Sequence, residues 1–153
     1  MRIITRLVAG LILSLTVALA AQAQGSAHAV ELQLLASVNR ARQDQGLPGL
    51  RWNDALASAA RRHAGLMAQH GAAEHVFAGE PSLAARVTQA GARFVSLSEN
   101  IAQGPTVETI HAEFLSSPNH RANILDSDMD TIGIGIVERG GQLFAVEDFS
   151  KAK

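Results

Sequence analysis

The last third of the chain carries its clearest structural pattern. Residues 131–137 alternate isoleucine with small side chains at period two, which is typical of a strand with one apolar face. Gly140-Gly141 then turns the chain into residues 142–149, so an antiparallel hairpin is expected here. A further strand is expected over 94–101. Because the preceding patterns are mostly helical and do not alternate with strands, the order predicts an α+β fold.

Capping residues and apolar spacing predict four helices ahead of this hairpin. Apolar residues recur at helical spacing from Val30 onward. Asn53 is suited to cap a second helix, which should end near Gly71. Ser82 and Thr106 are suited to cap a third and a fourth helix.

The N-terminus has the pattern of a cleaved export signal. Arg2 and Arg6 precede a mostly apolar run over 8–21, and Ala21-Gln22-Ala23 forms a small-x-small cleavage site. The apolar run is shorter than the roughly 20 residues of a membrane-spanning helix. We therefore expect a signal peptide over 1–23, a secreted or periplasmic product and no membrane span after cleavage, the alternative being a retained anchor.

The remaining 130 of the 153 residues suit one domain with one core. Removal of the signal takes away two arginines and no carboxylate, so the net charge moves from −1 to −3. A mildly acidic chain lacks the electrostatic pattern of a nucleic-acid partner. There is no cysteine, so an exported domain of this sequence depends on its core alone.

Three segments, taken together and in order, resemble the CAP superfamily of cysteine-rich secretory, antigen 5 and pathogenesis-related proteins. They read Leu-Arg-Trp-Asn-Asp-Ala-Leu-Ala-Ser-Ala-Ala over 50–60, Ser-Glu-Asn-Ile over 98–101 and Ser-Pro-Asn-His-Arg-Ala-Asn-Ile-Leu over 117–125. The lack of cysteine favours the bacterial SCP-domain extracellular branch. The resemblance implies one α-β-α sandwich over 30–150, with a small antiparallel sheet flanked by helices, after a short flexible lead over 24–29.

Two histidines are candidates for a cleft. His63 lies on the same helical face as Leu56 and Ala60, so periodicity alone favours a satisfied core histidine. The resemblance instead matches His63 to the family's first cleft histidine. His120 follows Ser-Pro-Asn near an expected helix start, where the positive end of the helix disfavours the imidazolium. Its alternative is an ordinary surface residue.

Carboxylates supply the other candidates. Glu99 ends an apolar strand, where a buried carboxylate needs a partner, and it matches the family's second carboxylate. The other family carboxylate falls near Glu74, with Glu80 as the alternative, and both could instead be solvated loop charges. Glu147 and Asp148 lie on opposite faces of the last strand, so one of them should approach the covered face of the sheet. The family commonly has a glutamine near Glu147.

A binding cleft lined by His63, Glu74, Glu99 and His120 is therefore expected. Two neutral imidazoles, His63 and His120, could hold Zn²⁺ or another divalent cation. The resemblance implies an exported binding module for a small apolar ligand, a glycan or a cell-envelope partner, since family members are associated with lipid and sterol binding. The alternatives are a peptidase-like hydrolase, with Glu99 or Glu74 as base and His63 or His120 as acid or metal ligand, and a purely structural envelope protein.

Overall fold

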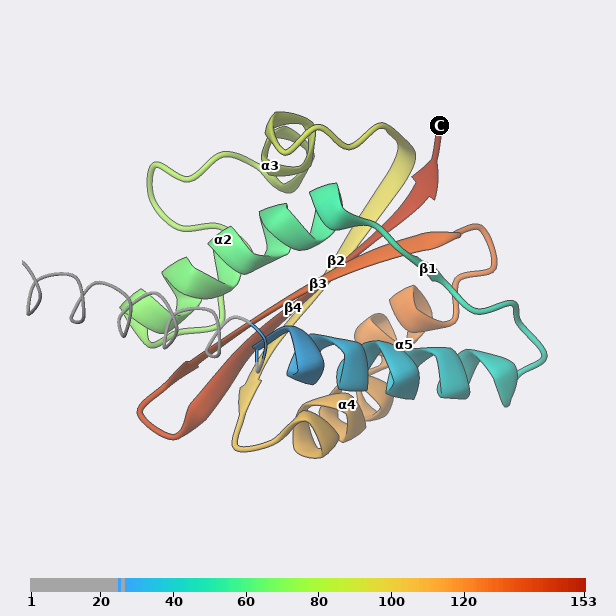
Figure 1. The fold of residues 1–153 in the computed structure, drawn as a ribbon, viewed down its shortest axis with the longest axis horizontal. Coiled ribbons are helices and arrows are strands. Elements are labelled where there is room, and N and C mark those ends of the chain that lie inside the picture. Colours follow the sequence, from blue (N-terminus) through green and yellow to red (C-terminus); the bar gives the residue numbers. More distant parts are fainter. Residues whose placement is uncertain (1–24, 26) are drawn as a thin grey trace, which may run out of the picture.

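The computed structural model describes residue 25 and residues 27–153. The expected signal peptide over 1–23 lies outside the described residues, as does part of the expected lead over 24–29. Residues 27–29 are helical and belong to a helix that runs over 27–43 (Figure 1). Nowhere in the part of the chain that is described is a helix both long and apolar enough to cross a bilayer.

The sheet has four strands in the order β1-β3-β4-β2. They are β1 (Arg51–Trp52), β2 (Phe94–Gly104), β3 (Thr131–Arg139) and β4 (Gln142–Ala152). The expected hairpin is confirmed as β3 and β4, with Gly140 and Gly141 both at positive φ in the turn. The sheet is not wholly antiparallel, because the two-residue β1 pairs in parallel with β3.

The expected caps are present at the starts of three helices. Asn53 accepts two main-chain hydrogen bonds at the start of α2 (Asp54–His70). Ser82 caps α3 (Leu83–Gln89), and Thr106 caps α4 (Val107–Ser116). Pro118 does not simply follow α4: it is the first residue of a further short helix, α5 (Pro118–Ile124), because proline is well suited to that position.

Helices cover both faces of the sheet, so the expected α+β sandwich is confirmed (Figure 1). On one face, α2 packs Ala60, Ala64 and Met67 against side chains of β2 and β4, while α3 packs against the start of α2. On the other face lie the helix over 27–43, α4 and α5, whose apolar side chains surround the isoleucines of β3.

Two glycines of β3 set how closely α2 approaches the sheet. A Cβ at Gly133 would lie 2.0 Å from the main-chain nitrogen of Ala57, and one at Gly135 would lie 2.2 Å from that of Arg61. The isoleucines of β3 point to the opposite face, so the α2 face of this strand carries little side-chain bulk. The backbone of α2 therefore lies almost directly on β3, which fixes where its side chains meet the sheet.

Candidate functional site

Glu99 is the centre of a buried polar cluster on the α2 face of the sheet. It lies on β2, the outermost strand, directly across from Asp148 on β4. The side chain of Arg86, from α3, donates to Glu99 Oε2, and both residues are buried. Arg86 also lies 3.4 Å from Glu80 Oε1. One buried guanidinium thus faces two carboxylates, which is the pairing that buried charges require.

His75 covers this cluster from the loop over 71–81. Its Nδ1 lies 2.8 Å from Glu99 Oε1, and its side chain is 60% exposed. The main-chain oxygen of His75 accepts a hydrogen bond of 3.0 Å from Arg86. The sequence predicted a loop at His75, and the structure makes it the solvent-accessible partner of Glu99.

His63 lies beneath the cluster and is completely buried. Its Nδ1 lies 2.7 Å from Glu80 Oε1, while its Nε2 is 4.0 Å from Glu99 Oε2. Glu80 also accepts a hydrogen bond of 3.0 Å from the main-chain nitrogen of Phe77. Glu80, and not Glu74, is therefore the carboxylate beside His63, whereas Glu74 is exposed in the loop.

His120 reaches the same edge of the sheet from the other face. It lies in the first turn of α5, with its ring edge-on to Phe114 at a centroid distance of 5.2 Å. The pKa of His120 is lowered, mainly by burial and further by the charge of His75, while Glu113 acts in the opposite direction. His120 was expected to favour the neutral imidazole because of the helix start, but burial is the larger cause.

Glu147 and Asp148 are both buried, although only one of them was expected to approach a covered face. The reason is that helices cover both faces of the sheet. Burial raises the pKa of Asp148, and the neighbouring Glu99 raises it further, while Arg86 opposes this. Burial raises the pKa of Glu147 to about 8, against a hydrogen bond from Asn100.

These positions do not suit the metal site expected at His63 and His120. The ring of His63 is sealed, and its Nδ1 is held by Glu80. Both oxygens of Glu99 are engaged by His75 and Arg86. Within residues 27–153, no group of three His, Asp or Glu side chains is placed to hold a metal ion. Divalent-metal binding stays a prediction.

A cavity of about 380 Å³ opens beside Glu99. It is lined by His75, Val76, Ser82, Leu83 and Glu99. Val76 is 52% exposed, so the rim presents an apolar side chain to solvent, with one buried carboxylate deeper in the cleft. This combination can hold a small ligand with an apolar body and a hydrogen-bonding end.

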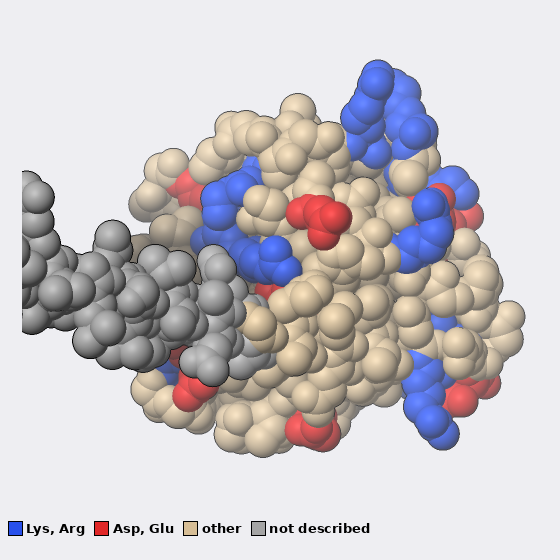
Figure 2. All heavy atoms as spheres, viewed as in Figure 1, with Lys and Arg blue, Asp and Glu red and all other residues tan. Residues whose placement is uncertain are grey.

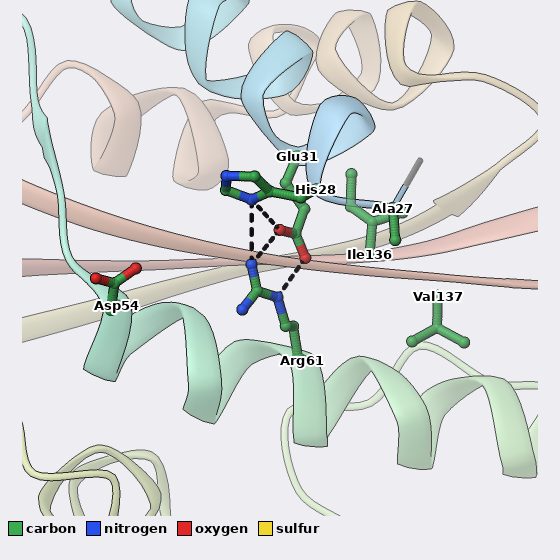
Figure 3. A pocket seen from close by; sticks show the side chains of 7 residues that line it. All are labelled: Ala27, His28, Glu31, Asp54, Arg61, Ile136 and Val137. Carbon is green, nitrogen blue, oxygen red and sulfur yellow. Dashed lines mark hydrogen bonds and ion pairs between the residues drawn. The ribbon is translucent and has the colours of Figure 1, made fainter. Parts of the chain in front are cut away.

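A second cavity, of about 460 Å³, lies beside β3, between the helix over 27–43 on one side of the strands and α2 on the other (Figure 3). Its main polar feature is an ion pair between Arg61 and the fully buried Glu31. The Nε of Arg61 donates a hydrogen bond of 2.7 Å to Oε1 of Glu31. His28 lies 3.3 Å from the same carboxylate. Glu31 is held by Arg61 and His28, much as Glu99 is held by Arg86 and His75. The cleft beside Glu99 differs in that a large, exposed apolar side chain, Val76, lines it.

The surface charge is divided into separate groups. Figure 2 shows lysine and arginine side chains in several small groups on one face, separated by uncharged surface and by acidic residues. On that face they do not join into a continuous basic surface. The expectation that the chain has no nucleic-acid partner stays a prediction.

Comparison with known proteins decides the family. Residues 35–149 match the sequence pattern of CAP, the cysteine-rich secretory protein family. The chain belongs to the CAP family. Its CAP domain contains every element of the buried cluster around Glu99, from α2 to β4.

Relatives of this CAP domain occur in bacteria. The uncharacterized protein YkwD of Bacillus subtilis (strain 168) is 31% identical over 119 residues, which are 77% of this chain and 46% of YkwD. The chain thus spans about half the length of this curated relative.

Solved structures share the fold. An extracellular protein containing an SCP domain, from Bacillus anthracis strain Ames, matches with a TM-score of 0.73 and 24% identity over 81% of this chain and 41% of that one. An outer surface protein from Borrelia burgdorferi matches with a TM-score of 0.72 and 22% identity over 78% of this chain and 90% of that one.

The sequence missed two members of the cluster in this CAP domain. The sequence allows His75 either an ordinary loop position or an extension of the metal site, and it gives Arg86 no predicted role. An available signal was the length of the loop over 71–81, since long irregular connections in compact domains are often functional. Arg86 gave no such signal, because its partner Glu99 lies in a different element.

Proposed function

We propose that this chain is an exported CAP-domain binding module whose ligand site is the cleft beside Glu99. The observation that carries the proposal is the cavity of about 380 Å³ in which an exposed apolar rim adjoins the buried Glu99 and the accessible His75. The extracellular description of the Bacillus anthracis relative and the export pattern of the N-terminus support secretion.

The ligand class follows from the lining of the cleft. Val76 and Leu83 suit an apolar body, while the carboxylate of Glu99 can accept a hydrogen bond from a hydroxyl or amine. Arg86 holds Glu99 in place from beneath, so the carboxylate is oriented before the ligand arrives. A sterol and a short glycan both carry an apolar surface with hydroxyl groups, and they are the two probes to compare.

Binding of a fluorescent sterol and of an N-acetylglucosamine tetramer would test the proposal by fluorescence and calorimetry. Val76→Asp at the rim should weaken binding of the preferred probe by at least about tenfold. Val95→Asp is the matched control, because Val95 is also exposed, at 69%, but does not line the cleft. Equal affinity of the two variants for the probe, or no binding of either probe, would contradict the proposal.

Activity assays on peptides, esters and glycans separate this function from the hydrolase alternative. We expect no turnover by the wild-type chain. Turnover that is lost in both His63→Ala and His120→Ala would establish the hydrolase instead.

A further inference from the structure

Glu147 is a fully buried carboxyl group on the face of the sheet opposite to α2. Its cross-strand neighbours are Asn100 on β2 and Ile134 on β3. One carboxyl oxygen, Oε2, accepts a hydrogen bond of 3.0 Å from Asn100, and the other, Oε1, has no hydrogen-bond partner within residues 27–153. A carboxyl group with a single neutral partner is not placed to carry a charge at this depth.

Asn100 joins this carboxyl group to α5. Its side-chain Nδ2 donates both to Glu147 and, over 3.1 Å, to the main-chain oxygen of His120. Its Oδ1 accepts a hydrogen bond of 2.8 Å from Asn123, one turn further along α5. Asn123 also donates to the main-chain oxygen of Glu99, over 3.4 Å. The buried Asn100 amide therefore ties α5 to Glu147, and Asn123 ties α5 to the main chain of Glu99.

Among the residues that the structure describes, no cation lies close enough to Glu147 to balance a carboxylate. Of the titratable groups on the helices of this face, His111 on α4 and His120 on α5 both have a pKa lowered by burial. Arg42, on the helix over 27–43, donates to main-chain oxygens around the end of α5, among them that of Ile124. Glu31 on the same helix is paired with Arg61.

We propose that Glu147 is a positioning residue: uncharged, it holds the Asn100 amide in the orientation that anchors α5, and so places His120 beside β2, the strand that carries Glu99. Ionisation of Glu147 would leave a buried charge facing one amide. The Asn100 contacts would then rearrange and α5 would loosen. This inference goes beyond the proposed function and does not require that a ligand binds in the cleft beside Glu99.

Hydrogen exchange and NMR of the whole mature chain test the inference without any ligand. In the wild type, amide protection in α5, corrected for intrinsic exchange and compared with α4, should fall at least about tenfold as the pH rises through about 8. The NMR signal of the His120 ring can be assigned by its absence in His120→Gln. Its chemical shift should change a second time in the same pH range, at a higher pH than the titration of His120 itself.

Glu147→Gln keeps an acceptor for Asn100 but cannot ionise. This variant should retain α5 protection and show a single His120 step. Glu138→Gln, which changes an exposed carboxylate of β3, should behave as the wild type. Unchanged wild-type protection across this pH range, or the same loss in Glu147→Gln, would overturn the inference. Neither measurement uses a ligand. Failure of this inference is therefore seen by hydrogen exchange and NMR, whereas failure of the proposed function is seen in the binding of the sterol and glycan probes.

Discussion

His63 Nδ1 lies 2.7 Å from Glu80 Oε1, and neither side chain is open to solvent. A histidine expected to line a cleft is thus held inside the domain by a carboxylate from the loop over 71–81. Through Arg86, this pair is linked to Glu99, so the loop, α2, α3 and β2 share one buried polar network. His63 and Glu80 support the site from beneath, and His75 meets the solvent.

Removal of Glu80 should destabilise the domain. Glu80→Ala leaves His63 Nδ1 and the main-chain nitrogen of Phe77 without their partner, so we expect a loss of about 2–4 kcal/mol in the free energy of unfolding. Glu74→Ala, in the same loop but exposed, should change it by less than about 0.5 kcal/mol. Urea unfolding followed by the fluorescence of Trp52 measures both, and equal losses would refute the assignment of Glu80.

The close approach of α2 to β3 predicts opposite effects for two glycine substitutions. Gly133→Ala places a Cβ 2.0 Å from backbone of α2, so the helix must move and we expect a loss of at least about 3 kcal/mol or no folding. Gly65→Ala, within α2, meets no atom within 4 Å and should stabilise by about 0.5–1 kcal/mol. Thermal unfolding distinguishes them. A tolerated alanine at 133 would mean that α2 lies further from the sheet.

The ion pair in Figure 3 should also matter for stability. The hydrogen bond to Glu31 is the main cause that raises the pKa of Arg61. Arg61→Ala leaves the fully buried Glu31 with only His28, which we expect to cost about 2–3 kcal/mol, a figure reduced because Arg61 is 42% exposed. Arg62→Ala removes an exposed contact with Ser58 and a long contact of 3.4 Å with the main-chain oxygen of Arg86, and should cost less than about 1 kcal/mol. Denaturant unfolding measures the loss in both variants, and a loss in Arg61→Ala no larger than in Arg62→Ala would contradict this prediction.

Glu147 makes stability fall as the pH rises. The unfolded chain releases this proton near pH 4.5 and the folded chain near pH 8, so between these values the folded state binds more protons and loses stability with increasing pH. Glu147→Gln removes this contribution. The free energy of unfolding of the variant, relative to that of the wild type, should therefore increase as the pH rises across that range, by at most roughly 5 kcal/mol. Unfolding measured from pH 5 to pH 9 checks the slope, and parallel curves for the two chains would disprove it.

Export can be examined by terminal sequencing. We expect the mature chain to begin at Gln24 and to be recovered from the periplasm or the medium. Replacement of Ala21 and Ala23 by bulky residues should block cleavage and leave the longer chain with the membrane. Intact Met1 on wild-type protein from a membrane fraction would contradict the prediction.

Much of the fold could be predicted because its signals are local. Asn53, Ser82 and Thr106 cap the helices that they were expected to cap, and the Gly140-Gly141 turn lies where the hairpin required it. These features depend on residues within one turn or one strand. The parallel pairing of β1 with β3 could not be predicted in this way, since it joins Arg51 to Thr131 and β1 has only two residues.

The site was predicted less well because its contacts join distant elements. Glu99 lies at the centre of the cluster, but its exposed partner is His75 and its buried cation is Arg86. Nothing in the neighbourhood of either residue in the sequence indicates these pairings. The burial of both Glu147 and Asp148 likewise depends on helices covering each face of the sheet, which only the assembled fold determines.

The strand order β1-β3-β4-β2 has a consequence for how the chain acquires its structure. The two central strands come last in the sequence, and the strands that flank them come earlier. A nascent chain that has emerged only as far as residue 130 lacks both strands on which α2, β1 and β2 assemble. The sheet can form only once residues 131–152 are free, by contacts of long sequence separation that slow folding. A chain of this topology therefore cannot complete its sheet until that segment has left the ribosome or a translocation channel.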